Sequence, residues 1–335
     1  MQRVYITLQG DNKIAIHNLN SETGKITHQE DISTPGGPAP FAISPDNTRA
    51  YIGLRDDNVM ASFDIDESTG ALKPTGKIGL ESDPCYVSVD NTGRHLLSAY
   101  YGAGHIAIHP IDEQGVLGGA PTEWIATRHR AHCAQTDASN SYTFLPHVDD
   151  SNAIYQYKFN DKTGKLTPNT PAIIEPPTGH GPRHYAYHPN GKFVYFDNEQ
   201  HSSVTAYKFD SVTGTLEAFQ TLSTLPDDFT GENSNAQIHM SPDGNYLYAA
   251  NRGHNSIAMY SVKDSTGELT PLGQQQSLGT PRAFGIDPTG KFMLVGGLDN
   301  GDLATYTIES SGTLRHLNTQ RVGNLPMWIH ITDPI

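Results

Sequence analysis

Basic, acidic and imidazole side chains recur at two matching places in a repeat that runs through this chain. The first place is the start of one predicted strand in each repeat, and it holds Ala39, Cys85, His132, Arg183, Ala236, Arg282 and Met327. The second is the end of the strand that follows, and it holds Gln9, Arg55, Tyr101, Val148, Glu199, Arg252 and Leu298. Four arginines, a histidine, a glutamate and a tyrosine are a marked concentration in a chain with only 22 Lys plus Arg.

These side chains suit chemistry on a small anion if the fold brings them together. A guanidinium group can hold a carboxylate or a phosphate through two hydrogen bonds, and a carboxylate beside an imidazole supplies a base and an acid. An alternative is that the arginines and Glu199 form salt bridges between neighbouring repeats and have a structural role. For His132 both interpretations stay open, because a histidine at a strand end is often a hydrogen-bonded filler.

Two landmarks define the repeat that positions these residues. One is a hairpin of the pattern Asp/Ser-x-Thr-Gly-x-Leu, whose glycine lies at Gly24, Gly70, Gly115, Gly164, Gly214, Gly267 and Gly312. The other is a turn of the Pro-Asp-Gly type between two apolar strands, at 45–47, 91–93, 138–140, 189–191, 242–244 and 288–290. The hairpin glycine allows the positive φ of a tight turn without steric cost.

A repeat of about 45 residues with four short strands is typical of a β-propeller blade. Runs such as Phe-Val-Tyr-Phe at 193–196 are rich in side chains that favour strands, and no segment has the spacing of an amphipathic helix. Seven copies therefore predict an all-β chain folded as a seven-bladed β-propeller.

The two ends of the sequence predict how the ring closes. Residues 4–8 match the second strand of the repeat, and residues 327–332 match its first strand. We expect these two segments to lie in one blade, which closes the ring and makes residues 1–335 a single domain. In a propeller the first strands all begin, and the second strands all end, around one mouth of the central tunnel. The polar side chains named above are therefore expected at that mouth, with the Pro-Asp-Gly type turns at the opposite end.

Bulk properties limit the possible partners. A net charge of −14 argues against duplex nucleic acid and against an anionic membrane surface. Two cysteines, Cys85 and Cys133, form no disulfide framework and are expected to be free thiols in a reducing compartment. No signal peptide and no long apolar run is visible. These features predict a soluble cytoplasmic protein, and they leave its oligomeric state open.

Motifs for other chemistry are weak or missing. His180, His184 and His188 have a spacing of four, but Gly179, Gly181 and Pro182 exclude a helix that would bring them together. No Gly-x-Ser-x-Gly elbow, Walker loop or dinucleotide fingerprint occurs. We therefore expect no metal and no cofactor.

Several motifs resemble the lactonase family of seven-bladed propellers, over almost the whole chain. They are Gly181-Pro182-Arg183-His184, His188-Pro189-Asn190-Gly191-Lys192, Asn198-Glu199, Ile238-His239-Met240-Ser241-Pro242-Asp243-Gly244, Asn251-Arg252, Thr280-Pro281-Arg282-Ala283-Phe284 and Pro326-Met327-Trp328. That family includes the bacterial propeller-type 6-phosphogluconolactonase and a fungal carboxymuconate lactonizing enzyme. The residues proposed to do the chemistry in the fungal enzyme fall here on His132, Arg183, Glu199 and Arg252.

The resemblance implies a lactone hydrolase that acts on a small anionic lactone or sugar acid, with 6-phosphogluconolactonase of the pentose phosphate pathway as the best match. Glu199 would be the base and His132 the acid, while Arg183 and Arg252 would stabilise developing charge. The expected substrate-binding residues are Arg55, Tyr101, His239 and Arg282.

Two alternatives stay open at the level of sequence. The same side chains could serve the lactonising direction on a carboxylated muconate. A non-catalytic interaction propeller is the alternative of a different class, although the Trp-Asp dipeptides of such scaffolds are missing.

Overall fold

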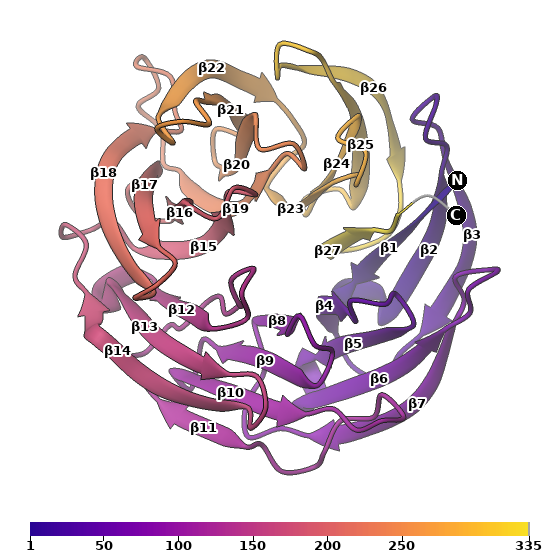
Figure 1. The fold of residues 1–335 in the computed structure, drawn as a ribbon. Helices are drawn as coiled ribbons and strands as arrows, with labels where there is room; N and C mark the ends of the chain where they lie inside the picture. Colours follow the sequence, from indigo (N-terminus) through magenta and orange to yellow (C-terminus); the bar gives the residue numbers. More distant parts are fainter. Residues whose placement is uncertain (334–335) are drawn as a thin grey trace.

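The structure, a computed structural model, describes residues 1–333 as seven antiparallel sheets arranged around one axis (Figure 1). Six of the sheets have four strands and one has three. In each four-stranded sheet the innermost strand is the first of its repeat, and the others follow outward in chain order, except where the ring closes. The predicted seven-bladed β-propeller is thereby confirmed, and each sheet is called a blade below.

The strands have the following bounds, blade by blade. The closing blade holds β27 (Pro326–Ile331), β1 (Gln2–Leu8), β2 (Lys13–Leu19) and β3 (Ile26–Ser33), and the next holds β4 (Pro38–Ile43), β5 (Arg49–Leu54), β6 (Val59–Ile65) and β7 (Leu72–Gly79). Then come β8 (Tyr86–Val89), β9 (His95–Tyr100), β10 (His105–Pro110) and β11 (Glu123–Ala126), followed by β12 (Tyr142–His147), β13 (Ala153–Asn160) and β14 (Lys165–Ile174). The fifth blade holds β15 (Pro182–Tyr187), β16 (Phe193–Asn198), β17 (Ser203–Asp210) and β18 (Thr215–Ser223). The sixth holds β19 (Ser234–Met240), β20 (Tyr246–Arg252), β21 (Ser256–Val262) and β22 (Leu269–Gln276). The seventh holds β23 (Pro281–Ile286), β24 (Phe292–Gly297), β25 (Asp302–Ile308) and β26 (Leu314–Arg321).

Helical structure within residues 1–333 is limited to three short 3-10 turns, η1 (Gln9–Asp11), η2 (Arg55–Asp57) and η3 (Asp149–Ser151). Each follows the second strand of a blade. None of these helices is long and apolar enough to cross a membrane.

The hairpin glycines explain why the repeat keeps its pattern. All seven have a positive φ, between 68° and 82°. A Cβ atom on any of them would lie within 1.9 to 2.7 Å of a side chain at the start of the second strand in the preceding blade, such as Tyr142 for Gly214 or Arg49 for Gly115. Only glycine fits both the turn and this close approach. Each hairpin therefore packs directly on its neighbouring blade.

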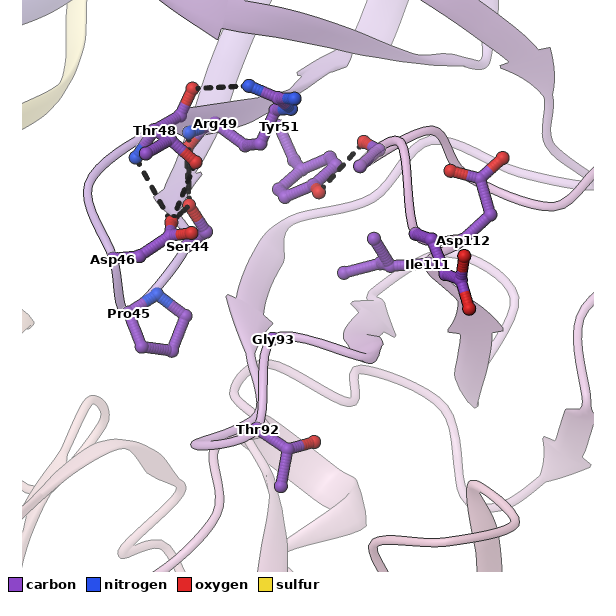
Figure 2. A pocket seen from close by; sticks show the side chains of 12 residues that line it. Ser44, Pro45, Asp46, Thr48, Arg49, Tyr51, Thr92, Gly93, Ile111 and Asp112 are labelled. Carbon is purple, nitrogen blue, oxygen red and sulfur yellow. Dashed lines mark hydrogen bonds between the residues drawn. The ribbon is translucent and has the colours of Figure 1, made fainter. Parts of the chain in front are cut away.

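A tyrosine hydroxyl adds a bond at four of these blade contacts. Tyr5, Tyr51, Tyr195 and Tyr248 donate to the carbonyl oxygens of Gly70, Gly115, Gly267 and Gly312, at 2.8 to 2.9 Å. Figure 2 shows Tyr51 reaching toward its neighbouring hairpin across a surface pocket that Ser44, Asp46 and Asp112 also line. The tyrosine-rich strands thus join blades as well as fill their cores.

The ring closes through β1 and β27, as the sequence predicts. Val4, Ile6 and Leu8 on β1 pair with Ile331, Ile329 and Pro326 on β27, and these two strands lie side by side in Figure 1. The apolar side chains of both strands share one core cluster. The innermost strand of this blade thus comes from the opposite end of the chain to its other three strands.

The blade of β12–β14 departs from the predicted pattern. The segment 131–136, expected to form a regular first strand, is joined to β12 only by isolated bridges at Ala131 and Thr136. The Tyr185 hydroxyl from the next blade lies between this segment and β12, where it donates to Gln135 O and Phe144 O and accepts the Gln135 N–H. These bonds replace ladder bonds, so His132 lies on irregular backbone.

Bulges interrupt the inner strands near the mouth of the tunnel. In β15 the register passes from Pro182 to Tyr185, and in β23 it passes from Pro281 to Ala283. Arg183 and Arg282 therefore lie in bulges. A bulge changes the direction in which a side chain points compared with a regular strand. Similar register shifts occur at the corresponding ends of β4 and β19, and where β1 meets β27.

Removal of residues 326–335 deletes β27 entirely, and we expect the shortened chain to lose its cooperative unfolding transition. The deletion exposes β1 and the apolar core that it shares with β27. Thermal unfolding followed by circular dichroism measures this, with a chain ending at Asp333 as the control that keeps β27. A shortened chain that melts cooperatively at the control temperature would contradict the closure.

Candidate active site

The inner strands and the turns beside them meet around one cavity at the predicted mouth of the tunnel. Its lining includes Arg55, Cys85, His132, Arg183 and Arg282, together with Met327 and Trp328 from β27. Glu199 adjoins it through its ion pair with Arg183, and Arg252 adjoins it through its ion pair with Glu199. We call His132, Arg183, Glu199, Arg252 and Arg282 the mouth site. The structure thus brings together residues that are up to 150 positions apart in the sequence (282 − 132).

Glu199 is the anion at the centre of the mouth site. One of its carboxylate oxygens lies 3.2 Å from Arg183 Nε, and the other lies 2.6 Å from Arg252 Nη2. The same Arg252 nitrogen donates to the carbonyl oxygen of Asn235 at 2.6 Å. Arg183 is buried, with 2% of its surface exposed, so its positive charge depends on Glu199. The alternative of a salt bridge between blades describes the Glu199–Arg252 pair, whereas Arg183 and Glu199 pair within one blade, and neither contact excludes a role in binding.

The other two arginines differ from each other in their partners. Arg55 forms an ion pair with Asp83, with 3.0 Å between Arg55 Nε and Asp83 Oδ2. Arg282 forms no ion pair or hydrogen bond with any other side chain in residues 1–333. Burial and the neighbouring Arg183 and Arg252 lower the pKa of Arg282 to about 9. Counting Arg55 and Asp83, the mouth carries four guanidinium groups against two carboxylates, so it has an excess of positive charge.

His132 contacts a second imidazole rather than an acid. Its Nδ1 lies 3.2 Å from His184 Nε2, and the Tyr101 ring meets it edge-on with 5.8 Å between ring centroids. Burial and the charges of Arg183 and Arg282 hold the pKa of His132 well below its usual range. His132 is therefore neutral at pH 7 in the unliganded protein. A neutral His132 differs from the expectation that it is the acid at the start of the reaction, because position in the repeat does not reveal burial beside three arginines.

Asp197 supports the mouth site, and the sequence analysis missed it. It is fully buried behind Arg183, and its Oδ1 accepts the His184 N–H at 2.7 Å, within the bulge of β15. Burial raises the pKa of Asp197 to about 7, although Arg183 acts in the opposite direction. The sequence did contain a signal for Asp197, because it is an acidic residue in β16, a strand that is otherwise mostly apolar. A carboxyl group is rarely buried without a polar partner, so its position predicts a specific contact.

The remaining predicted residues lie at the edge of the mouth or away from it. Tyr101 is 37% exposed beside His132. His239 does not line the mouth cavity and lies in a second cavity further along the tunnel. The three spaced histidines lie apart: His180 stacks on His201, His184 contacts His132, and His188 lies near Asp264. The described residues contain no cluster of three or more His, Cys, Asp or Glu side chains that could hold a metal ion.

Comparison with known proteins identifies the family of this chain. Residues 3–331 match the family described as lactonase, 7-bladed beta-propeller. The chain belongs to this family. It is 32% identical to a 6-phosphogluconolactonase from Pectobacterium atrosepticum over 332 residues, which cover 98% of each chain. It is also 32% identical to the protein of the same name from Yersinia enterocolitica, with 99% of each chain covered.

A solved structure from Bacteroides fragilis, named as a candidate 6-phosphogluconolactonase, also resembles this lactonase-family chain. It has a TM-score of 0.89 and 25% sequence identity, and the match covers 99% of this chain and 98% of the other. The family resemblance found in the sequence motifs is thereby confirmed.

The pKa of Asp197 predicts a pH dependence of stability. The carboxyl group titrates near 3.8 when unfolded and at about 7 when folded, so its contribution is complete below pH 4 and is lost as the pH rises through 7. The free energy of unfolding should fall by up to about 4 kcal/mol over this range. Asp197→Asn keeps an oxygen for the His184 N–H and removes the titration, so its curve should be flatter.

Chemical denaturation between pH 4 and pH 7 measures this difference. Asp90→Asn is the control, because hydrogen bonds from His95, Thr92 and Asn140 hold the pKa of Asp90 well below its usual range despite its burial, so Asp90 stays ionised when folded and its own titration falls below this pH window. Parallel curves for the wild type and Asp197→Asn would show that Asp197 is ionised throughout.

Proposed function

We propose that this chain is a 6-phosphogluconolactonase, which hydrolyses the δ-lactone of a phosphorylated sugar acid to the open-chain acid. The observation that carries the proposal is the excess positive charge of the mouth, above all the unpaired guanidinium group of Arg282. A partly buried cation without an ion-pair partner is unfavourable, and a dianionic phosphate on the substrate would compensate it. The names of the relatives from Pectobacterium and Yersinia support the same substrate.

In this proposal the two ends of the substrate meet different arginines. Arg282 binds the phosphate, with Arg55 on the same side of the mouth but already paired with Asp83. Arg183 and Arg252 face the lactone carbonyl, where a guanidinium group stabilises the oxyanion that forms as water adds. Tyr101 lies at the exposed edge, where it borders the substrate on the solvent side.

The contacts favour His132, rather than Glu199, as the group that accepts a proton from water. Both oxygens of Glu199 are already held by Arg183 and Arg252, whereas His132 is neutral. Burial and the charges of the arginines both depress the pKa of His132, and a bound anion compensates the second cause, so the substrate itself raises this pKa. Glu199 then orients the two guanidinium groups and limits their repulsion.

The reaction balances with water alone. The water oxygen bonds to the lactone carbon as its proton passes to the imidazole of His132. When the tetrahedral intermediate collapses, the bond from this carbon to the ring oxygen breaks, and the imidazolium returns the proton to the departing oxygen. One histidine thus acts as base and then as acid, so the acid role expected from the sequence belongs to the second step.

We also propose that the protein works in the cytoplasm and without a cofactor. Both of its cysteines, Cys85 and Cys133, are buried and unpaired, which suits a reducing compartment. The hydrolysis needs no electron transfer and no group carrier.

Variants of His132 and Glu199 separate their roles. We expect His132→Asn to lower kcat on 6-phosphoglucono-δ-lactone by about 10²–10⁴-fold, the usual contribution of a general base. Glu199→Gln should lower kcat less and should not raise KM, because it removes a negative charge next to an anionic substrate. Rates are measured by proton release with spontaneous hydrolysis subtracted. A larger loss of kcat in Glu199→Gln than in His132→Asn would return the base role to Glu199.

The phosphate site is tested at Arg282. Arg282→Gln should raise KM for 6-phosphoglucono-δ-lactone by about ten- to hundredfold, the value of a lost charged hydrogen bond, and leave unphosphorylated glucono-δ-lactone unaffected. Arg55→Gln is the matched control with a smaller effect, since Arg55 already has a partner. Turnover of a carboxymuconate without hydrolysis of either gluconolactone would refute the proposed function.

A further inference from the structure

The tunnel holds a second cavity beyond the mouth. It has a volume of about 310 Å³. We call it the inner cavity, and it is lined by Tyr86, Gln135, His184, Tyr185, Ala186, Tyr187, Gln237, Ile238, His239, Met240 and Trp328. On β15 and β19 its lining comes from the later residues of each strand, whereas Arg183 at the mouth comes from the beginning. The inner cavity therefore lies toward the end of the tunnel where the Pro-Asp-Gly type turns are found.

Three side chains separate the inner cavity from the mouth site. His184, Gln237 and Trp328 line both cavities, so they form the partition between them. The partition is fixed by its neighbours: Tyr86 meets the rings of His184 and Trp328 edge-on, with 5.1 and 5.4 Å between ring centroids. The tunnel thus contains two separate spaces.

The two spaces differ completely in charge. No lysine, arginine, aspartate or glutamate lines the inner cavity. Burial lowers the pKa of His239 to about 4, and burial with Arg183 nearby holds the pKa of His184 well below its usual range, so both imidazoles are neutral at pH 7. The inner cavity therefore offers an anion none of the stabilisation that the mouth site offers.

Two glutamines give the inner cavity one free donor and one free acceptor. Gln237 is 4% exposed, and its Oε1 accepts the Phe284 N–H at 3.1 Å, which fixes the orientation of the amide. Its Nε2 has no hydrogen-bond partner within residues 1–333. Gln135 is oriented in the opposite sense, because its Nε2 donates to Tyr185 O at 2.6 Å and its Oε1 has no hydrogen-bond partner among the described residues 1–333. Both amides are held by backbone groups and are therefore preorganised.

Aromatic rings supply the rest of the walls. Tyr86, Tyr187 and Trp328 line the inner cavity beside Met240. A small-molecule site is usually a concave space of at least 300 Å³ with mostly apolar walls and a few fixed polar groups. Hydroxyl groups both donate and accept, so a ring that carries several of them can satisfy Gln237 and Gln135 together while its apolar face lies against the aromatic walls.

From these observations we propose that the inner cavity is a second ligand site, which binds a neutral sugar ring of hexose size. It is distinct from the mouth site in location, charge and ligand class. The proposal does not depend on the function proposed for the mouth site, because no residue of the mouth site takes part in it.

Titration of the full-length protein with D-glucose tests the proposal. Trp328 lines the inner cavity, and Trp124, the other tryptophan, stacks on His105 in an outer strand. Trp124→Phe therefore leaves Trp328 as the sole tryptophan reporter. We expect D-glucose to change its fluorescence with a dissociation constant in the millimolar range. The same change should occur when 6-phosphogluconate saturates the mouth site.

Gln135→Met should weaken glucose binding by about three- to tenfold, since it removes the free acceptor. Gln220→Met is the matched control, because Gln220 bonds to the backbone of Leu269 away from the tunnel and its loss should leave glucose binding unchanged. Thermal unfolding of both variants shows whether they are folded.

Three results would overturn the proposal. They are no response to glucose in the wild type, displacement of glucose by 6-phosphogluconate, and a response to phenol without one to glucose. The wild-type titrations decide the matter even if Gln135→Met fails to fold. Failure of the lactonase assays together with intact glucose binding would count against the proposed function alone.

Discussion

The pairing of β27 with β1 is the contact on which the site depends. It joins the two ends of the chain in one blade and makes the inner strands a closed set around a single axis. Because these strands all start at the same end of the tunnel, residues far apart in the sequence meet there. Glu199 can then hold Arg183 from its own blade and Arg252 from the next. Bulges in the inner strands finish the arrangement by turning Arg183 and Arg282 out of regular register.

The positive charge of the mouth site is only partly compensated by carboxylates, and an anionic ligand would complete the compensation. Burial and the charge of neighbouring arginines lower the pKa of Arg183 and of Arg282, and the single carboxylate of Glu199 is not enough to compensate the three guanidinium groups of the mouth site. Burial and the charge of the same arginines hold the pKa of His132 well below its usual range. In the proposed mechanism an anionic substrate does two things at once, since it neutralises the arginines and raises the basicity of the histidine. Binding and activation are coupled by electrostatics, without any movement of the fold.

The fold could be predicted from the sequence, because every blade has a glycine in the same hairpin and the same steric reason requires it there. The two polar columns follow from this repeat, so Arg183, Glu199 and Arg252 could be placed in advance. Three features of the site could not be predicted from the sequence. The Tyr185 hydroxyl that disrupts the segment of His132 comes from a neighbouring blade, and the repeat does not encode it. The difference between paired Arg55 and unpaired Arg282 depends on Asp83, which lies outside both columns. The position of His239 beyond the partition depends on which side chains fill the tunnel.

The chain as a whole and the mouth of its tunnel carry charge of opposite sign, and this difference affects the rate at which an anionic substrate binds. The chain carries a net charge of −14, while the mouth carries more guanidinium groups than carboxylates. At low ionic strength an approaching phosphate ester is repelled by the molecule at long range and attracted at short range. Salt at about 0.1 M screens interactions beyond about 10 Å and leaves the partly buried arginines largely effective. Encounter with an anionic substrate should therefore become faster as salt is first added, and slow again only when the attraction at the mouth is screened as well.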